Sequence, residues 1–211
     1  MELTREAWQE TLVQRHGQQL QKAFSDATVA ICGLGGLGSN IAIALARAGI
    51  GKLVLADFDR VDISNLHRQQ YTAAQEGMRK TDALKASLTE IAPYMEVEAH
   101  SARITEQNAV ELLQQADMIC EAFDDAEAEA MLTEIVLEKM PDKYLIAASG
   151  MAGLGSGNAI KTRKITNRFY LCGDESSDVQ TEGTLFSARV MLCAAHQALT
   201  VLRILAGEFE T

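Results

Sequence analysis

The chain has 211 residues, of which 47% are hydrophobic, and this composition is typical of a globular protein with a sizeable core. Asp and Glu outnumber Lys and Arg by 29 to 19, which gives a formal net charge of −10. Nucleic acids and anionic membranes attract clustered cations, so this charge argues against nonspecific binding to either. An anionic ligand must therefore be held by a few local cations and backbone amides.

No segment approaches the roughly 18 apolar residues of a membrane span. The mixed-charge beginning of the chain lacks the hydrophobic region of a signal peptide. The cysteines are widely spaced and form no CxxC pair, which is typical of reduced thiols and does not support a four-cysteine zinc site. We therefore expect a cytoplasmic protein that uses no zinc and binds neither nucleic acid nor membrane. The cysteines are Cys32, Cys120, Cys172 and Cys193.

The predicted elements begin with a helix over residues 4–20, and strands and helices then alternate as far as residue 148. This order indicates right-handed crossovers and a mainly parallel sheet with helices on both faces. The predicted strands cover residues 28–32, 52–56, 96–100, 117–121 and 144–148, and the predicted helices cover residues 37–48, 81–91, 105–115 and 126–140.

The pattern changes after residue 149. Two strands, at 158–162 and 168–172, are expected to form an antiparallel extension of the sheet. An acidic loop over residues 173–183 follows, and a last helix covers residues 185–206. The fold class is therefore α/β and Rossmann-like. We expect one domain over residues 1–211, divided into an N-terminal helical arm (1–25), a βαβ core (26–150) and a C-terminal part (151–211).

A glycine turn, Gly33-Leu34-Gly35-Gly36-Leu37-Gly38, follows a predicted strand, opens a helix and fits G-x-G-x-x-G. Glycines permit a tight turn and the close approach of a phosphate, and the helix N-terminus offers free N–H groups. Asp57 ends the next strand, where a carboxylate can accept hydrogen bonds from ribose hydroxyls. The turn does not distinguish NAD from ATP, and by itself it favours a dehydrogenase.

The stretch 57–70 (DFDRVDISNLHRQQ) is polar where a dinucleotide-binding unit would normally enter its next helix. It places carboxylates, an Asn, an Arg and two Gln at the carboxyl end of the sheet, where ligands bind. Lys80 starts the next helix, and Asp124 follows another strand at the same edge. Two cations, Arg68 and Lys80, and a carboxylate able to hold Mg²⁺ indicate phosphoryl or nucleotidyl transfer.

Four motifs, GLGGLGSN, DFDRVDISNLHRQQY, GMRKTDALK and EAFDD, resemble the ThiF/MoeB family of ubiquitin-activating-type adenylyltransferases. The later motifs AASGMAGLGSGNAIKTRKI, LCGDES and RVMLCAAHQA resemble its short ThiF form, so the resemblance covers nearly the whole chain. It implies a homodimer that uses ATP and Mg²⁺. The implied reaction is adenylation of the C-terminal glycine carboxylate of a ubiquitin-like sulfur carrier, a ThiS-like protein with a Gly-Gly tail, in thiamine thiazole biosynthesis.

The resemblance also implies residue roles. Asp124 corresponds to a Mg²⁺-binding aspartate, and Asp125 is left as the cap of the following helix. Arg15 lies roughly where relatives carry an arginine that reaches into the partner subunit's site. Residues 151–211 would supply carrier-binding strands, a crossover loop and the last helix. The candidate catalytic residues are Arg68, Lys80, Asp124 and Arg15, and the candidate nucleotide-binding residues are Gly33, Gly35, Gly36, Gly38, Asp57, Asp59, Asn65, Arg68, Gln69 and Lys80.

Several alternatives stay open at this point. A related family member could adenylate a molybdopterin carrier or a tRNA base, and an NAD(P)-binding oxidoreductase or a silent carrier-binding subunit would share the glycine turn. Cys172 is the candidate for a later persulfide step. We expect neighbouring carboxylates to raise the pKa of its thiol and so make it less reactive.

Overall fold

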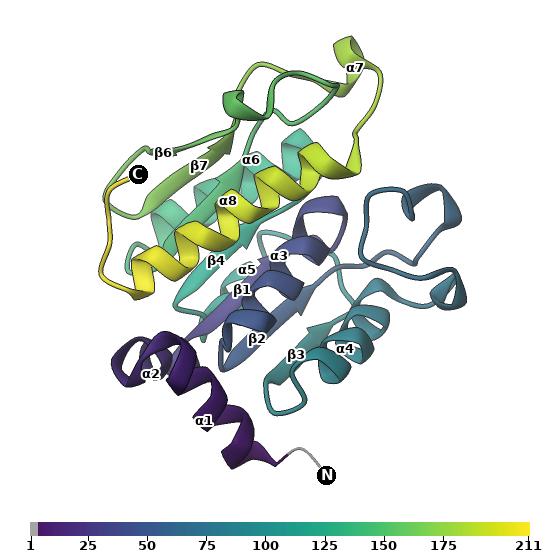
Figure 1. The fold of residues 1–211 in the computed structure, drawn as a ribbon. Helices are drawn as coiled ribbons and strands as arrows, with labels where there is room; N and C mark the ends of the chain where they lie inside the picture. The colour runs from purple at the N-terminus through teal and green to yellow at the C-terminus, as the bar shows by residue number, and fades with distance from the viewer. Residues whose placement is uncertain (1–3) are drawn as a thin grey trace.

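The computed structural model describes residues 4–211. Within them a single seven-stranded sheet has the order β3-β2-β1-β4-β5-β7-β6 (Figure 1). Every pairing between neighbouring strands is parallel except that of β6 with β7, as the predicted antiparallel extension requires. The strands are β1 (Thr28–Cys32), β2 (Lys52–Ala56), β3 (Glu96–His100), β4 (Met118–Glu121), β5 (Tyr144–Ala148), β6 (Lys161–Lys164) and β7 (Phe169–Gly173).

Helices cover both faces of the sheet, which confirms the predicted Rossmann-like α/β fold (Figure 1). In β1, Val29 and Ile31 enter the core beneath α3, α4 and α8, whereas Ala30 and Cys32 enter the core beneath α5 and α6. Burial on both faces explains why the strand is continuously apolar rather than alternating. The covering helices are α3 (Gly36–Ala48), α4 (Lys80–Ile91), α5 (Ala109–Leu113), α6 (Ala126–Lys139) and α8 (Ser187–Leu205).

The prediction of one N-terminal helix is wrong, because the chain forms α1 (Arg5–His16) and α2 (Gln18–Asp26) instead. Gly17 separates them with φ 85°, a backbone conformation that glycine adopts easily and that ends the first helix. Leu12 of α1 and Gln21 of α2 both pack against Gly49, the residue that caps the end of α3. The N-terminal arm is therefore folded against the amino edge of the sheet.

Three further boundaries differ from the prediction. The helix expected over 105–115 is only α5, because Asn108 accepts a hydrogen bond from the Thr105 N–H and forms a turn before it. The strand expected over 158–162 begins at Lys161, since residues 157–159 form a 3-10 turn capped by Ser156. The acidic loop over 173–183 contains a short helix, α7 (Val179–Glu182), capped by Asp178.

Within residues 4–211, α8 is the one helix that is long and apolar enough to cross a membrane, whereas we expected no such segment from the sequence. Half of this helix is buried in the protein. Its Gln197 is fully buried and donates hydrogen bonds to the backbone oxygens of Glu121 and Ile146 at 2.9 and 3.1 Å. The apolar length of α8 is therefore explained by its packing beside α3 on the sheet.

Candidate nucleotide-binding site

The glycine turn after β1 has a shape that side chains would prevent. Gly33 has φ +91°, and a Cβ there would lie 2.6 Å from the backbone oxygen of Ala122. A Cβ on Gly38 would lie 1.8 Å from the Gly33 oxygen, so the first turn of α3 is pressed against the end of β1. The start of α3 therefore lies at the carboxyl edge of the sheet, and the N–H groups of a helix N-terminus bind anions well.

Asp57 lies beside this turn and helps to hold it. Its side chain accepts hydrogen bonds from the N–H groups of Leu34 at 2.6 Å and Asp59 at 2.7 Å. Tyr71 donates from its hydroxyl to the Leu34 oxygen at 2.8 Å. Each carboxylate oxygen of Asp57 retains a further lone pair that could accept from a ribose hydroxyl. Asp57 thus has a structural role, besides the predicted binding role, that the sequence did not reveal.

Asn65, Arg68 and Gln69 form a hydrogen-bonded group over the turn. The Asn65 Oδ1 accepts from Arg68 Nη2 at 3.1 Å and from Gln69 Nε2 at 3.2 Å. Gln69 is buried, and its Oε1 has no hydrogen-bond partner within residues 4–211. Its Nε2 lies 3.7 Å from the position that a Cβ on Gly35 would occupy. A buried acceptor without a donor, beside an open glycine, fits a site that a ligand's hydroxyl or amine completes.

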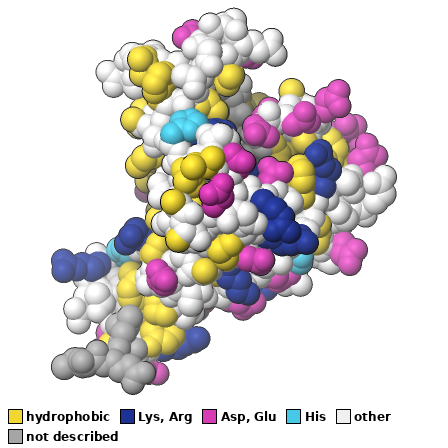
Figure 2. All heavy atoms as spheres, turned by 90° about the vertical axis from the view of Figure 1, so that its right-hand side faces the viewer, with side chains coloured by type: hydrophobic (Ala, Val, Ile, Leu, Met, Phe, Trp, Pro, Cys, Tyr) yellow, Lys and Arg dark blue, Asp and Glu magenta, His cyan; other side chains and the backbone are white. Residues whose placement is uncertain are grey.

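Two candidate cations follow β2 in the chain: Arg68 precedes α4, and Lys80 is the first residue of α4. The Arg68 Cγ lies 3.5 Å from the Cβ position of Gly36. Lys80 is buried, and its Nζ forms an ion pair with Asp59 Oδ2 at 2.9 Å. Figure 2 shows this side of the molecule, where Lys and Arg side chains lie among Asp and Glu side chains. The structure thus brings Arg68 to the glycine turn and holds Lys80 through Asp59.

Asp124 and Asp125 lie at the end of β4, at the same edge of the sheet. Asp125 caps α6, since its Oδ1 accepts from the Ala128 N–H at 2.9 Å, as the sequence predicted. Asp124 is exposed. The described residues contain no group of three or more His, Cys, Asp or Glu that could hold a metal ion by themselves. Protein-bound Mg²⁺ usually takes one or two carboxylates together with phosphate oxygens, so the donor set at Asp124 fits that mode.

Arg15 is not brought to this site within one chain. It is exposed on the last turn of α1, and α1 packs at the end of α3, where Leu12 approaches Gly49. The glycine turn is at the start of α3, so the length of that helix separates the two (Figure 1). A role for Arg15 requires a second copy of the chain and stays a prediction.

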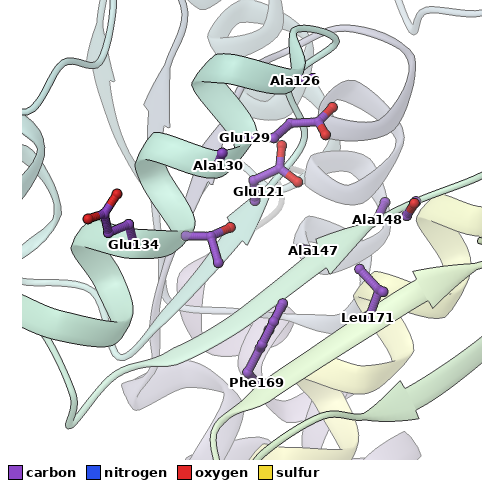
Figure 3. A pocket seen from close by; sticks show the side chains of 11 residues that line it. Glu121, Ala126, Glu129, Ala130, Glu134, Ala147, Ala148, Phe169 and Leu171 are labelled. Atoms are coloured by element: carbon purple, nitrogen blue, oxygen red, sulfur yellow. The ribbon is translucent and has the colours of Figure 1, made fainter.

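A buried carboxyl group near the site was not singled out by the sequence analysis. Glu121 ends β4 with 2% of its surface exposed, and its Oε1 accepts from the Phe123 N–H at 2.6 Å. Burial raises the pKa of this carboxyl to about 8. The hydrogen bond from the Phe123 N–H lowers the pKa, and the negative charge of Glu129 raises it, each by less than burial does. Figure 3 shows Glu121 and Glu129 in a cavity of about 580 Å³ between α6 and the strands β5 and β7.

Cys172 is fully buried in β7. Burial raises the pKa of its thiol to about 11, while hydrogen bonds with Thr162 and Thr200 oppose the shift. The expected direction is therefore confirmed. The expected cause was wrong, because burial and not the neighbouring carboxylates produces the shift.

A seven-stranded, mainly parallel sheet with a glycine turn at its carboxyl edge defines a Rossmann-like α/β protein. Residues 9–211 match the ThiF family, and the chain belongs to this family. That places it among E1-like proteins whose curated relatives are named as adenylyltransferases.

One such relative is the adenylyltransferase and sulfurtransferase MOCS3 of Culex quinquefasciatus, which is 30% identical over 199 residues, or 90% of this chain and 44% of the relative. Another is the adenylyltransferase and sulfurtransferase UBA4 of Lodderomyces elongisporus, which is 26% identical over 195 residues, or 90% of this chain and 42% of the relative. The chain thus spans less than half the length of these curated relatives.

Two solved structures show the same fold. The E. coli tRNA N6-threonylcarbamoyladenosine dehydratase TcdA in complex with AMP has a TM-score of 0.85 at 18% identity, and the alignment covers 99% of this chain and 98% of TcdA. E. coli MccB has a TM-score of 0.72 at 20% identity, covering 93% of this chain and 62% of MccB. At these identities the likeness concerns the fold alone.

Proposed function

We propose that this chain uses ATP and Mg²⁺ to adenylate the C-terminal glycine carboxylate of a ubiquitin-like sulfur carrier, a ThiS-like protein with a Gly-Gly tail that serves thiamine thiazole biosynthesis. The observation that carries the proposal is the meeting of four features at one edge of the sheet. These are the glycine turn, the Asp57 carboxylate, the Arg68 and Lys80 cations and the exposed Asp124. Membership of the ThiF family supports this class of reaction.

Different residues bind different parts of ATP. The N–H groups at the start of α3 hold phosphate oxygens, and Asp57 accepts from the ribose. Gln69 Oε1 offers a further acceptor to the nucleotide, because it has no partner elsewhere in residues 4–211. Lys80 is held by its ion pair with Asp59, whose side chain is nearly half exposed, and supplies a positive charge to the phosphates. In this proposal the α-phosphate lies at the carboxyl edge, open to a second substrate.

The reaction joins a carboxylate oxygen of the carrier to the α-phosphorus and breaks the bond from that phosphorus to pyrophosphate. The carboxylate is ionised at neutral pH, so no general base is required. What the site must supply is in-line positioning and compensation of the charge that grows on the leaving pyrophosphate. Arg68 and Lys80 provide this compensation, and Mg²⁺ held at Asp124 would add to it.

The proposed assembly is a homodimer. Arg15 lies far from its own glycine turn, so it contributes only if the α1 helix of a second copy reaches this site. A sedimentation experiment that gives the mass of a single chain would remove both the dimer and the role of Arg15.

The reaction is tested by exchange of labelled pyrophosphate into ATP. The assay contains Mg²⁺ and a ThiS-type carrier ending in Gly-Gly, the same carrier without its tail, a molybdopterin-type carrier, or unmodified tRNA. We expect exchange with the intact ThiS-type carrier and none after removal of the tail. Exchange with the molybdopterin-type carrier and with no other substrate would change the proposed partner and leave the proposed reaction unchanged. Exchange with tRNA alone, or none with any substrate in folded protein, would contradict carboxylate adenylation of a carrier.

A further inference from the structure

Arg189 is a buried cation that none of the roles above explains. It lies in the first turn of α8 with 7% of its side chain exposed and forms an ion pair with Asp174, whose side chain is equally buried. Its Nε and Nη1 are buried and have no hydrogen-bond partner in the described part of the chain. A cation at a helix N-terminus also opposes the helix dipole. A buried guanidinium with two unused donors at such a position requires an acceptor.

The position of Arg189 connects it with the nucleotide site. The next residue, Val190, has its Cγ1 2.9 Å from the Cβ position of Gly36, so the first turns of α8 and α3 are in contact (Figure 1). Asp174 follows β7 directly and donates from its N–H to the Gly150 oxygen, beyond the end of β5. The guanidinium therefore lies at the carboxyl edge of the sheet, on the side of the glycine turn away from Asp57.

The surroundings of the guanidinium favour a carboxylate as the missing acceptor. Asp174 fixes it from one side, since the Asp174 Oδ1 accepts from the N–H groups of Ser176 and Ser177 at 2.9 and 2.8 Å while Oδ2 contacts Arg189. On the other side the guanidinium packs against the backbone of Gly155, since a Cβ on Gly155 would be 2.2 Å from Nη1. Arg68 lies beside the phosphate-binding turn and Lys80 is paired with Asp59, whereas Arg189 has donors free for a second anionic group.

We propose that Arg189 holds the carboxylate that is adenylated. This inference rests on the proposed function and deepens it. The Nε and Nη1 donors bind one carboxylate oxygen and the carbonyl oxygen of the residue before the terminal one, and the other carboxylate oxygen faces the α-phosphorus. That oxygen forms the new P–O bond as the bond to pyrophosphate breaks, and no proton is transferred. The glycine-rich segment 149–157 covers the donors in the free protein and must shift when the tail of the carrier enters.

A purely structural role makes a different prediction. In that case Arg189 only clamps residues 174–183 onto α8, and its loss matters because Asp174 is left buried without a partner. Removing both charges in Arg189→Gln/Asp174→Asn should then restore stability and activity together. If Arg189 holds the substrate, the double variant regains its melting temperature but not its use of the carrier.

The test compares Arg189→Gln, Asp174→Asn and the double variant with the wild type. Arg163→Gln is the matched control, because Arg163 is an exposed arginine that pairs with Glu175 in the same segment. Melting temperature, binding of a non-hydrolysable ATP analogue, and pyrophosphate exchange against concentration of a Gly-Gly-ended ThiS-type carrier are measured. We expect the double variant to bind the analogue within twofold of wild type, while kcat/KM for the carrier falls at least 100-fold.

The controls separate failure of this inference from failure of the proposed function. Arg163→Gln should keep kcat/KM for the carrier within about threefold, because it leaves both the Arg189 donors and their Asp174 partner in place. If the wild type shows exchange, normal use of the carrier by the double variant overturns the role of Arg189 alone. A loss of carrier use in Arg163→Gln as large as that of the double variant does so too. Absence of exchange in the folded wild type overturns the proposed function, and the role of Arg189 with it.

Discussion

Replacing Glu121 by Gln should stabilise the protein at neutral pH, by an amount that depends on pH. The pKa of the Glu121 carboxyl is raised from the ordinary 4.5 to about 8, mainly by burial. The folded state therefore keeps the proton up to about pH 8, whereas the unfolded state loses it above pH 4.5. Between these two pH values only the unfolded state is ionised, and ionisation lowers its free energy. The free energy of unfolding is therefore highest below pH 4.5 and falls as the pH rises to about 8.

The size of the effect follows from the width of this window. Each pH unit between the two pKa values lowers the free energy of unfolding by about 1.4 kcal/mol. From pH 4.5 to pH 7 the wild type thus loses roughly 3 kcal/mol through this one carboxyl group. Glutamine is neutral at every pH and still presents an Oε1 to the Phe123 N–H, so it resembles the protonated carboxyl and escapes the loss.

Urea denaturation at pH 5, 6, 7 and 8 and constant ionic strength measures this difference. The free energy of unfolding of Glu121→Gln minus that of the wild type should be below about 1 kcal/mol at pH 5 and rise to roughly 3 kcal/mol at pH 7. Glu134→Gln is the matched control, because Glu134 lines the same cavity from an exposed position on α6. A difference that does not grow with pH, or that grows equally in Glu134→Gln, would refute the assignment of a proton to Glu121 in the folded state.

Three further substitutions or modifications test the site. Lys80→Met should lower the rate of pyrophosphate exchange by about 10²–10³-fold, and a rate within tenfold of wild type would exclude charge compensation by this lysine. Gly38→Ala places a Cβ 1.8 Å from the Gly33 oxygen, so we expect a lower melting temperature in calorimetry and weaker binding of an ATP analogue; unchanged values of both would contradict the close approach. Because burial raises the pKa of Cys172 to about 11, iodoacetamide at pH 8 should label this thiol in the folded protein at least 100-fold more slowly than in urea, and equal rates would show it to be exposed.

The sequence determined the parts of the fold that depend on local pattern. Strand β1 and helix α3 could be placed from the spacing of their apolar residues, and the turn between them could be placed from its glycines. The candidate nucleotide-binding residues could be chosen because the carboxyl ends of parallel strands meet at one edge and because their motifs resemble the ThiF/MoeB family. Asp125 could be assigned as the cap of α6, since it directly precedes the helical period.

Tertiary structure decided what depends on contacts between distant segments. Gly17 breaks the N-terminal helix because Leu12 and Gln21, on either side of it, both pack against Gly49, and no local pattern contains that contact. Asn158 lies in a 3-10 turn although its neighbours alternate like a strand. A weak local preference yields in such places to the packing of the whole chain.

The same division holds for the site. The sequence indicated Asp57 as a ribose acceptor but not as the group that fixes the Leu34 N–H. It gave no means of predicting that Glu121 retains its proton or that Arg189 is buried with two free donors, because pKa values and hydrogen-bond satisfaction depend on what surrounds a group in space. Residue types and their order determined the family, and only the assembled core decided which charged groups are buried.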